Sequence, residues 1–203
     1  MKLQKYQFMT LKRKNSMVKK PLKEHSEKLT PTEDSKPKKI MVDDAKRLKE
    51  VRALVIENNK SIMKTDYIVC QIYKESRFKK FAGMNQHSAK GLMQMQLGAV
   101  KQVFKYRVQQ AKGGKMPSDK ETHRAFEDAN IFYQSDKMYD ESENVKIGTE
   151  YLQYWINKKS SLEEAYTAYR GTNEAYYSVI KPCAEKLVKD PNNMQILRDG
   201  IGK

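Results

Sequence analysis

Glu75 is the residue whose type and position best suit acid–base chemistry. It stands near the end of a segment in which Ile68 and Ile72 recur at helical spacing. If that helix packs inward through these two side chains, Glu75 and Ser76 fall on or near the same buried stripe. Burial disfavours the charged form of a carboxyl group and raises its pKa, as a general acid requires near neutral pH. We therefore predict a general acid at Glu75, although an isolated glutamate at a helix end more often only caps the helix or forms a salt bridge.

Three further segments, together with the one around Glu75, place motifs in a characteristic order. In this chain they read Glu-Ser-Arg-Phe, Ser-Ala-Lys-Gly-Leu-Met-Gln, Asn-Val-Lys-Ile-Gly-Thr-Glu-Tyr-Leu and Ala-Tyr-Arg-Gly. They lie at Glu75–Phe78, Ser88–Gln94, Asn144–Leu152 and Ala168–Gly171. In this order, and over about residues 46–187, the chain resembles the lytic transglycosylase family, the soluble-lytic-transglycosylase or goose-lysozyme-like enzymes that cut peptidoglycan. The resemblance implies a lysozyme-like helical domain that acts on peptidoglycan glycan strands.

The same resemblance implies a role for individual residues. Glu75 matches the catalytic glutamate, which is general acid and then general base. Gln94 matches the amide that contacts a sugar, and Tyr169 matches the tyrosine close to the catalytic carboxyl. Asn85 falls where the family usually has a serine near that carboxyl. We expect Asn85, Gln94, Tyr169 and Ser76 to bind substrate.

Other matched positions are expected to support the site rather than to act in it. Asn144 and Gly148 match a helix whose start supports the site and whose glycine permits close helix approach. We interpret both as capping and packing residues. Between Gln94 and Asn144 the chain is longer than the family pattern, so residues 115–140 are an insertion, expected to form a short helix or an ordered excursion that flanks a groove or merely pads the core.

The chain departs from the family pattern at the loop and at the edge of the cleft. Ser88 replaces a usual glycine, which predicts a differently tightened loop. Gln96 and Leu97 stand where the family often has Met-Pro, which removes support for one sugar contact. Arg170 replaces the asparagine that usually follows the tyrosine. Its added charge would suit an anionic peptide stem or simply face solvent.

The resemblance implies a route with one carboxyl group, whereas ordinary glycosidases pair two. The acids nearest to Glu75 are Asp66 and Glu57, nine and eighteen residues before it. In the single-acid route Glu75 protonates the glycosidic oxygen, the substrate's N-acetyl group stabilises the cationic centre, and Glu75 then takes the proton of the muramyl 6-hydroxyl, which gives a 1,6-anhydro end. A distant second acid would instead favour a lysozyme-type hydrolase. Candidates for that acid are Asp128, Asp136, Asp140 and Glu143.

The elements that must position these residues are all helical. Apolar side chains recur every three or four residues in six segments, and no convincing alternating strand occurs. Thr65 is a plausible N-cap for the helix that carries Glu75, and Pro182 is expected to kink or split the last helix. One helix is expected to begin after about Asp43. Five more are expected over residues 65–77, 97–110, 144–157, 162–168 and 174–188.

Charge divides the chain into two parts. Of its 203 residues, the first 40 carry 12 Lys or Arg against four acids, which places +8 of the net +15 there. With three prolines and few apolar residues, 1–40 is predicted to be a flexible basic arm, and 41–203 the catalytic domain. The arm would dock to a polyanion or a partner, or be a solvated tail.

Delivery to peptidoglycan is expected to need a specialised route. The basic start never develops the apolar segment of a secretory signal, and no stretch is apolar enough to span a membrane. We expect a protein made in the cytoplasm that acts on the cell wall as a phage virion component, through a secretion apparatus, or after lysis. The arm would bind the virion or secretion-apparatus protein.

No cofactor or metal is expected. His123 and Glu127 have helical ligand spacing but no third ligand pattern. Cys70 and Cys183 are expected to be buried thiols, with a disulfide as the alternative. A basic protein that binds nucleic acid is the competing function, disfavoured because charges of both signs are mixed through the core. A wall-binding protein with an inactive site is a third hypothesis, against which the presence of Glu75 argues.

Overall fold

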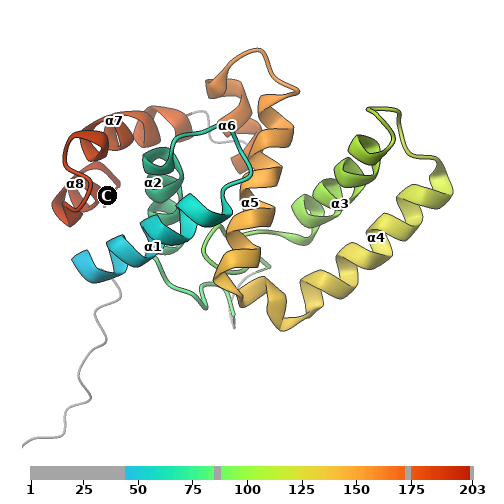
Figure 1. The fold of residues 1–203 in the computed structure, drawn as a ribbon, viewed down its shortest axis with the longest axis horizontal. Coiled ribbons are helices and arrows are strands. Elements are labelled where there is room, and N and C mark those ends of the chain that lie inside the picture. The colour runs from blue at the N-terminus through green and yellow to red at the C-terminus, as the bar shows by residue number, and fades with distance from the viewer. Residues whose placement is uncertain (1–43, 85–87, 172–174, 202–203) are drawn as a thin grey trace, which may run out of the picture. The chain divides into compact units, whose positions relative to one another are not determined.

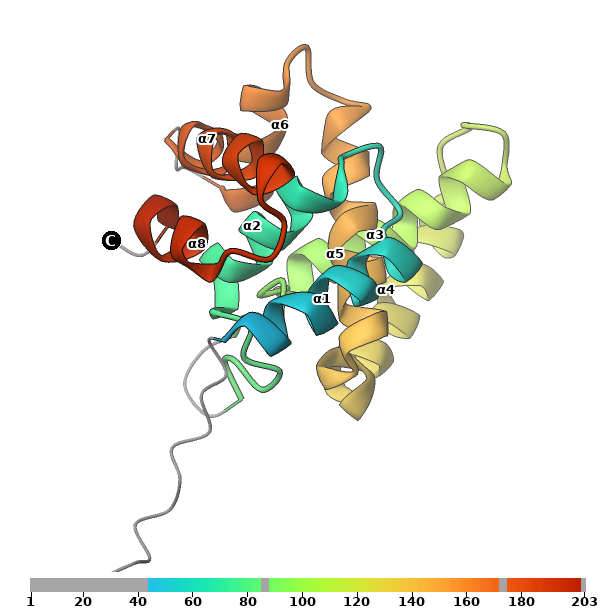
Figure 2. The ribbon, with the colours of Figure 1, turned by 60° about the vertical axis from the view of Figure 1, so that its left-hand side comes forward.

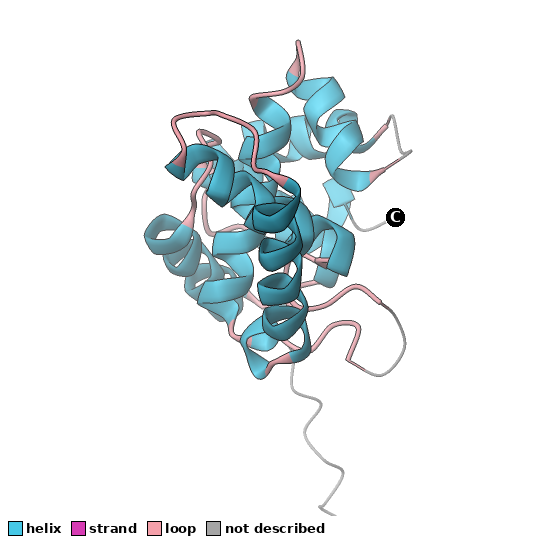
Figure 3. Ribbon diagram, turned by 90° about the vertical axis from the view of Figure 1, so that its right-hand side faces the viewer, coloured by secondary structure: helices cyan, strands magenta, loops and turns pink. Residues whose placement is uncertain are grey.

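The computed structural model describes residues 44–84, 88–171 and 175–201, and every regular element in these ranges is a helix (Figures 1 and 3). The single β-bridge among them joins Lys90 to Met95. The elements are α1 (Ala45–Asn58), α2 (Thr65–Ser76), α3 (Leu97–Ala111), α4 (Asp119–Gln134), the 3-10 turn η1 (Asp136–Tyr139), α5 (Glu141–Ile156), α6 (Leu162–Arg170), α7 (Tyr176–Lys189) and α8 (Met194–Ile201). The expected all-α class is confirmed for the described residues. The predicted basic arm, 1–40, lies outside them.

Helix α2 is the buried centre of the fold. Most of its side chains are inaccessible to solvent, including Ile68 and Ile72. Helices α7 and α8 pack along one side of α2, and α5 separates α2 from α3 and α4 (Figures 1 and 2). Because α2 is enclosed in this way, a polar side chain at its carboxyl end is held at a fixed place and partly removed from water.

The segment 115–140, expected to be a short helix or an excursion, is instead dominated by the sixteen-residue helix α4. A capping box starts it: the Ser118 side chain accepts from the backbone N–H of Glu121, and the Glu121 side chain accepts from the backbone N–H of Ser118. Helix α4 then packs beside α3, with the rings of Phe104 and Phe132 5.6 Å apart. No α4 residue lines the cavities at Glu75 described below.

Three other expectations about helices need correction. Thr65 is the first residue of α2 rather than its N-cap, which is Lys64 and provides no side-chain hydrogen bond. Helix α7 runs through Pro182, so the proline does not split it, and the alternative, a kink, stays a prediction. The short helix α8 was not expected, although its buried residues Met194, Leu197 and Ile201 have helical spacing.

The two cysteines lie in the core between α2 and α7. Cys70 and Cys183 are both buried free thiols, as expected, and their sulfur atoms lie 3.0 Å apart. The two cysteines do not form the disulfide that was the alternative expectation.

No helix among the described residues is long and apolar enough to cross a membrane. Within the same ranges, no three His, Cys, Asp or Glu side chains gather in a way that would hold a metal ion.

Candidate active site

Glu75 occupies the last turn of α2, and its side chain is only 7% exposed. The helix ends immediately after it because Arg77 and Phe78 both adopt the left-handed backbone region, with φ of 52° and 62°. This conformation is uncommon for residues other than glycine and costs free energy, so neighbouring contacts must hold it. The chain reversal after Glu75 therefore depends on contacts with the rest of the fold.

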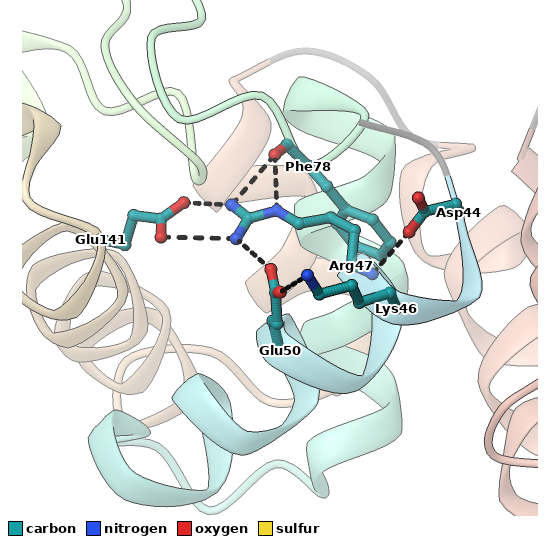
Figure 4. Close-up of polar contacts among 6 residues, drawn as sticks. All are labelled: Asp44, Lys46, Arg47, Glu50, Phe78 and Glu141. Carbon is teal, nitrogen blue, oxygen red and sulfur yellow. Dashed lines mark hydrogen bonds and ion pairs between the residues drawn. The ribbon is translucent and has the colours of Figure 1, made fainter. Parts of the chain in front are cut away.

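Side chains from three helices hold this reversal in place. Phe78 is fully buried, and its carbonyl oxygen accepts from Nε and Nη2 of Arg47 at 3.3 and 3.2 Å (Figure 4). The Arg47 guanidinium, which comes from α1, also pairs with Glu141 at the start of α5. Nη2 of Arg77 donates to the carbonyl oxygen of Ile201 in α8 at 2.9 Å. Because α1 and α8 bind the turn directly and α5 binds Arg47, the turn fixes the position of the preceding glutamate.

The loop that faces Glu75 is a tight turn closed by the bridge between Lys90 and Met95. Gly91 has a φ of +74°, and a Cβ atom there would lie 2.3 Å from Nδ2 of Asn144. The buried Asn144 side chain binds this loop at two points: its Oδ1 accepts from the N–H of Met93 at 2.8 Å, and its Nδ2 donates to the carbonyl oxygen of Lys90 at 3.1 Å. Asn144 thus supports the site through the loop rather than by capping its own helix, whose N-cap is Asp140.

Met93 packs this loop tightly against α5. A Cβ atom at Gly148 would lie 2.4 Å from Sδ of Met93, so the glycine permits a close approach between a helix and the loop, not between two helices as expected. The hydroxyl of Tyr169 donates to the carbonyl oxygen of Met93 at 3.0 Å. Helices α5 and α6 therefore both fix the loop that carries Gln94.

Two cavities meet at Glu75. One, of about 270 Å³, is lined by residues that include Tyr151 and Tyr169, and the other, of about 560 Å³, by residues that include Lys74 and Ser88. Four residues line both cavities: Glu75, Gln94, Gln96 and Arg170. The two cavities therefore adjoin at Glu75, and we refer to them together as the groove.

Polar groups from three helices, α2, α6 and α7, surround the Glu75 carboxyl. The Tyr176 hydroxyl, on α7, donates to Oε1 at 2.5 Å, and Nε of Arg170, on α6, lies 3.9 Å from the same oxygen. Burial raises the pKa of Glu75, while the hydrogen bond from Tyr176 and the charges of Arg170 and Lys74 act in the opposite direction. The net effect is a carboxyl group that keeps its proton to a higher pH than an exposed glutamate does.

Tyr176 and Tyr169 both remain hydroxyl donors at neutral pH. Burial, reinforced by the charge of Glu75, raises the pKa of each well above that of free tyrosine. The amide of Gln71, one helical turn before Glu75, is fully buried and has no hydrogen-bond partner among the described residues. The carboxyl therefore lies among neutral donors and two cations, an environment that suits reversible proton transfer.

Comparison with known proteins adds no relative: no family profile, no curated protein and no solved structure matches the chain. A function for the site must be inferred from its own geometry.

The structure brings together most of the predicted site residues. Glu75, Gln94 and Tyr169 line one groove, and Gln94 turns its Nε2 onto the carbonyl oxygen of Gly91 at 2.8 Å. Ser76 does not line the groove, because its buried hydroxyl donates to the carbonyl oxygen of Ile72 at 3.0 Å. Asn85 lies outside the described residues.

Tyr176 was missed by the sequence analysis, although it makes the shortest polar contact with Glu75 among the described residues. It lies seven residues after Tyr169, beyond the last matched motif. The available signal was the aromatic pair Tyr176 and Tyr177 at the start of an expected helix, which is equally typical of a core.

Glu75 is the one carboxylic acid among the described residues that line the groove. Of the distant acids considered as partners, Asp136, Asp140 and Glu143 line a separate cavity next to Phe81. Asp128 is exposed on α4. Glu174, which follows the groove residue Gly171 at close range in the sequence, lies outside the described residues.

Replacing Tyr176 by phenylalanine should raise the pKa of Glu75 further. The hydroxyl stabilises the ionised carboxylate, so its loss favours the protonated form, by about one pH unit or more. The measurement is a pH titration of the Glu75 side-chain carboxyl by ¹³C NMR. Tyr177→Phe, a buried neighbour on the same helix, is the control and should leave the titration unchanged. Equal titration curves for Tyr176→Phe and the wild type would show that the hydrogen bond does not set this pKa.

Proposed function

We propose that this chain is a peptidoglycan lytic transglycosylase with a lysozyme-like helical domain. It would cleave the β-1,4 bond between N-acetylmuramic acid and N-acetylglucosamine and leave a 1,6-anhydromuramyl end. The observation that carries the proposal is the position of Glu75: one carboxyl group, 7% exposed, in a groove in which no other described lining residue is an acid. The order of the four motifs supports the same activity.

The chemistry needs one group that first gives and then accepts a proton. Glu75, whose protonated form is favoured by burial, donates its proton to the glycosidic oxygen as the bond from the muramyl C1 to that oxygen breaks. The substrate's own N-acetyl oxygen stabilises the cationic C1. The resulting Glu75 carboxylate then takes the proton of the muramyl 6-hydroxyl while O6 bonds to C1. The proton returns to Glu75, and no water is consumed.

The groove residues would hold the glycan in reactive geometry. Gln94 has a side-chain oxygen free of described partners, and it lines both cavities on either side of Glu75. Tyr151 and Tyr169, with rings 5.3 Å apart, form part of the wall of the smaller cavity. Amide and aromatic groups in these positions suit sugar hydroxyls and apolar sugar faces, and positioning of this kind lowers the barrier.

A lysozyme-type hydrolase is the second candidate. It would need a second carboxylate opposite Glu75, acting as a nucleophile or as the base that activates a water, and no other described residue of the groove is an acid. A nucleic-acid-binding role has less support, because acidic side chains such as Glu50, Glu141 and Glu150 pair with basic ones across the described helices. We also propose that segment 1–40 attaches the enzyme to a phage virion or secretion-apparatus protein and that the enzyme acts on the cell wall.

Purified sacculi test the proposal directly. We expect the full chain to release soluble glycan fragments from sacculi, with no added metal or cofactor, while a sample inactivated by heat releases none. If the folded chain releases no fragments from sacculi of several peptide chemistries, that result would contradict a muralytic function.

A further inference from the structure

Arg170 is a charged group at the site with only one long ion pair among the described residues. It is the last residue of α6, its side chain is 50% exposed, and its Nε lies 3.9 Å from Oε1 of Glu75, beyond hydrogen-bond length. No other described residue pairs with its guanidinium. Because a guanidinium carries five N–H donors in a planar fork, both of its Nη groups are available to an incoming carboxylate.

Lys74 adds a second positive charge to the same side of the groove. It precedes Glu75 on α2, lines the larger cavity, and forms no hydrogen bond or ion pair with a described residue. Among the described residues lining that cavity, Glu75 is the only acid. When Glu75 holds its proton, the larger cavity therefore has two cations and no anion within its described lining. Such a cavity attracts an anionic ligand.

The positions of the two cavities also indicate which part of a bound substrate would supply such an anion. A glycan strand that fills the groove passes Glu75, and Arg170 lines both cavities at that point. The muramyl sugar at the cleaved bond carries a lactyl-linked peptide stem, whose side chains and carboxyl end provide carboxylates close to the scissile bond. A free phosphate or a nucleic-acid backbone lacks this link to a sugar seated at Glu75.

We propose that Arg170, assisted by Lys74, binds a carboxylate of the peptide stem in the larger cavity, and that this contact draws the guanidinium away from Glu75. The inference rests on the proposed function and names its substrate: peptide-bearing glycan strands rather than stripped ones. It makes Arg170 a substrate-binding residue that also governs the protonation of the acid.

The direction of the coupling follows from the charges around Glu75. In the free protein Arg170 favours the ionised carboxylate and so lowers the pKa that burial has raised. A stem carboxylate on Arg170 cancels that effect, so the pKa of Glu75 rises when a peptide-bearing strand binds. Tyr176 from α7, Tyr169 from α6 and Lys74 from α2 also face Glu75, and their contributions remain.

Activity of the acid requires its proton, so the coupling predicts how rate depends on pH. The pH profile of kcat reports ionisations in the enzyme–substrate complex, so on peptide-bearing strands the alkaline limb of kcat should lie at higher pH than on the same strands stripped of peptide by an amidase. We also expect kcat/KM to be about tenfold higher on the peptide-bearing strands, which corresponds to one good ion pair.

The test compares the wild type, Arg170→Gln and Arg170→Lys on both kinds of strand. Arg170→Gln should lose the preference, and its two alkaline limbs should coincide. Arg170→Lys should regain part of the preference, because it restores the charge without the planar fork. Arg124→Gln, an exposed arginine on α4, is the matched control and should behave as the wild type does.

The outcomes separate this inference from the proposed function. If the wild type cleaves both kinds of strand equally and with the same alkaline limb, the enzyme is muralytic and the inference about Arg170 is wrong. A preference that survives in Arg170→Gln also overturns it. If the folded wild type cleaves neither kind of strand, the proposed function fails, and the inference fails with it.

Discussion

Replacing Glu75 by glutamine should abolish cleavage of peptidoglycan, with a loss of at least about a thousandfold in the rate at which soluble fragments leave purified sacculi. Glutamine keeps the size of the side chain but can neither donate a proton to the glycosidic oxygen nor accept one from the 6-hydroxyl. Because one group performs both transfers in the proposed route, no other side chain among the described groove residues can replace it.

Folding must be intact for this result to bear on chemistry. The glutamine variant should retain its helical circular dichroism, and its stability relative to the wild type should improve as pH rises. The sign follows from the raised pKa of Glu75: over the range between the unfolded and folded pKa values, the folded protein holds more protons, so its stability falls with increasing pH. Glutamine does not titrate, so the variant does not lose stability in this way as the pH rises. Glu57→Gln, an exposed change of the same chemistry on α1, should alter neither rate nor stability. Wild-type activity in Glu75→Gln would remove Glu75 from the mechanism.

Replacing Asn144 by alanine should cost about 3 kcal/mol or more of the free energy of unfolding. The fully buried amide makes three hydrogen bonds to backbone groups: it accepts from Met93, and it donates to Lys90 at 3.1 Å and to Met138 at 2.9 Å. Alanine would leave these buried backbone groups unpaired. Chemical denaturation measures the loss.

Activity should fall together with stability in Asn144→Ala, because the same bonds hold the loop that presents Gln94 to Glu75. A reduced kcat/KM at a temperature where the variant is fully folded would separate this effect from unfolding. Asn192→Ala, on the exposed surface, is the matched control. If Asn144→Ala is as stable and active as the control variant, the loop does not depend on this side chain.

The sequence carried enough information to predict the centre of this fold. Apolar spacing at Ile68 and Ile72 located α2, and the prediction that Glu75 shares its buried side is confirmed by the small exposure of that side chain. The loop that the motif at Ser88–Gln94 implied is present as a tight turn, in which Gly91 adopts a positive φ. Local periodicity and turn chemistry were sufficient here because they depend on neighbours in the chain.

What the sequence could not provide are contacts between distant segments. The bond from Tyr176 to Glu75 joins positions 101 residues apart, and the bond from Arg77 to the carboxyl end of α8 spans 124 residues. Arg170 had two open interpretations until the structure placed it beside the carboxyl group. Such contacts depend on how whole helices pack, and no local pattern encodes them.

The chemistry of the ends released from purified sacculi tests the central claim most directly. Mass spectrometry of the soluble fragments should find muramyl ends that are 1,6-anhydro sugars, lighter by one water than ordinary reducing ends and resistant to reduction by borohydride. Fragments with only reducing muramyl ends would show a hydrolase and contradict the single-acid transglycosylase account.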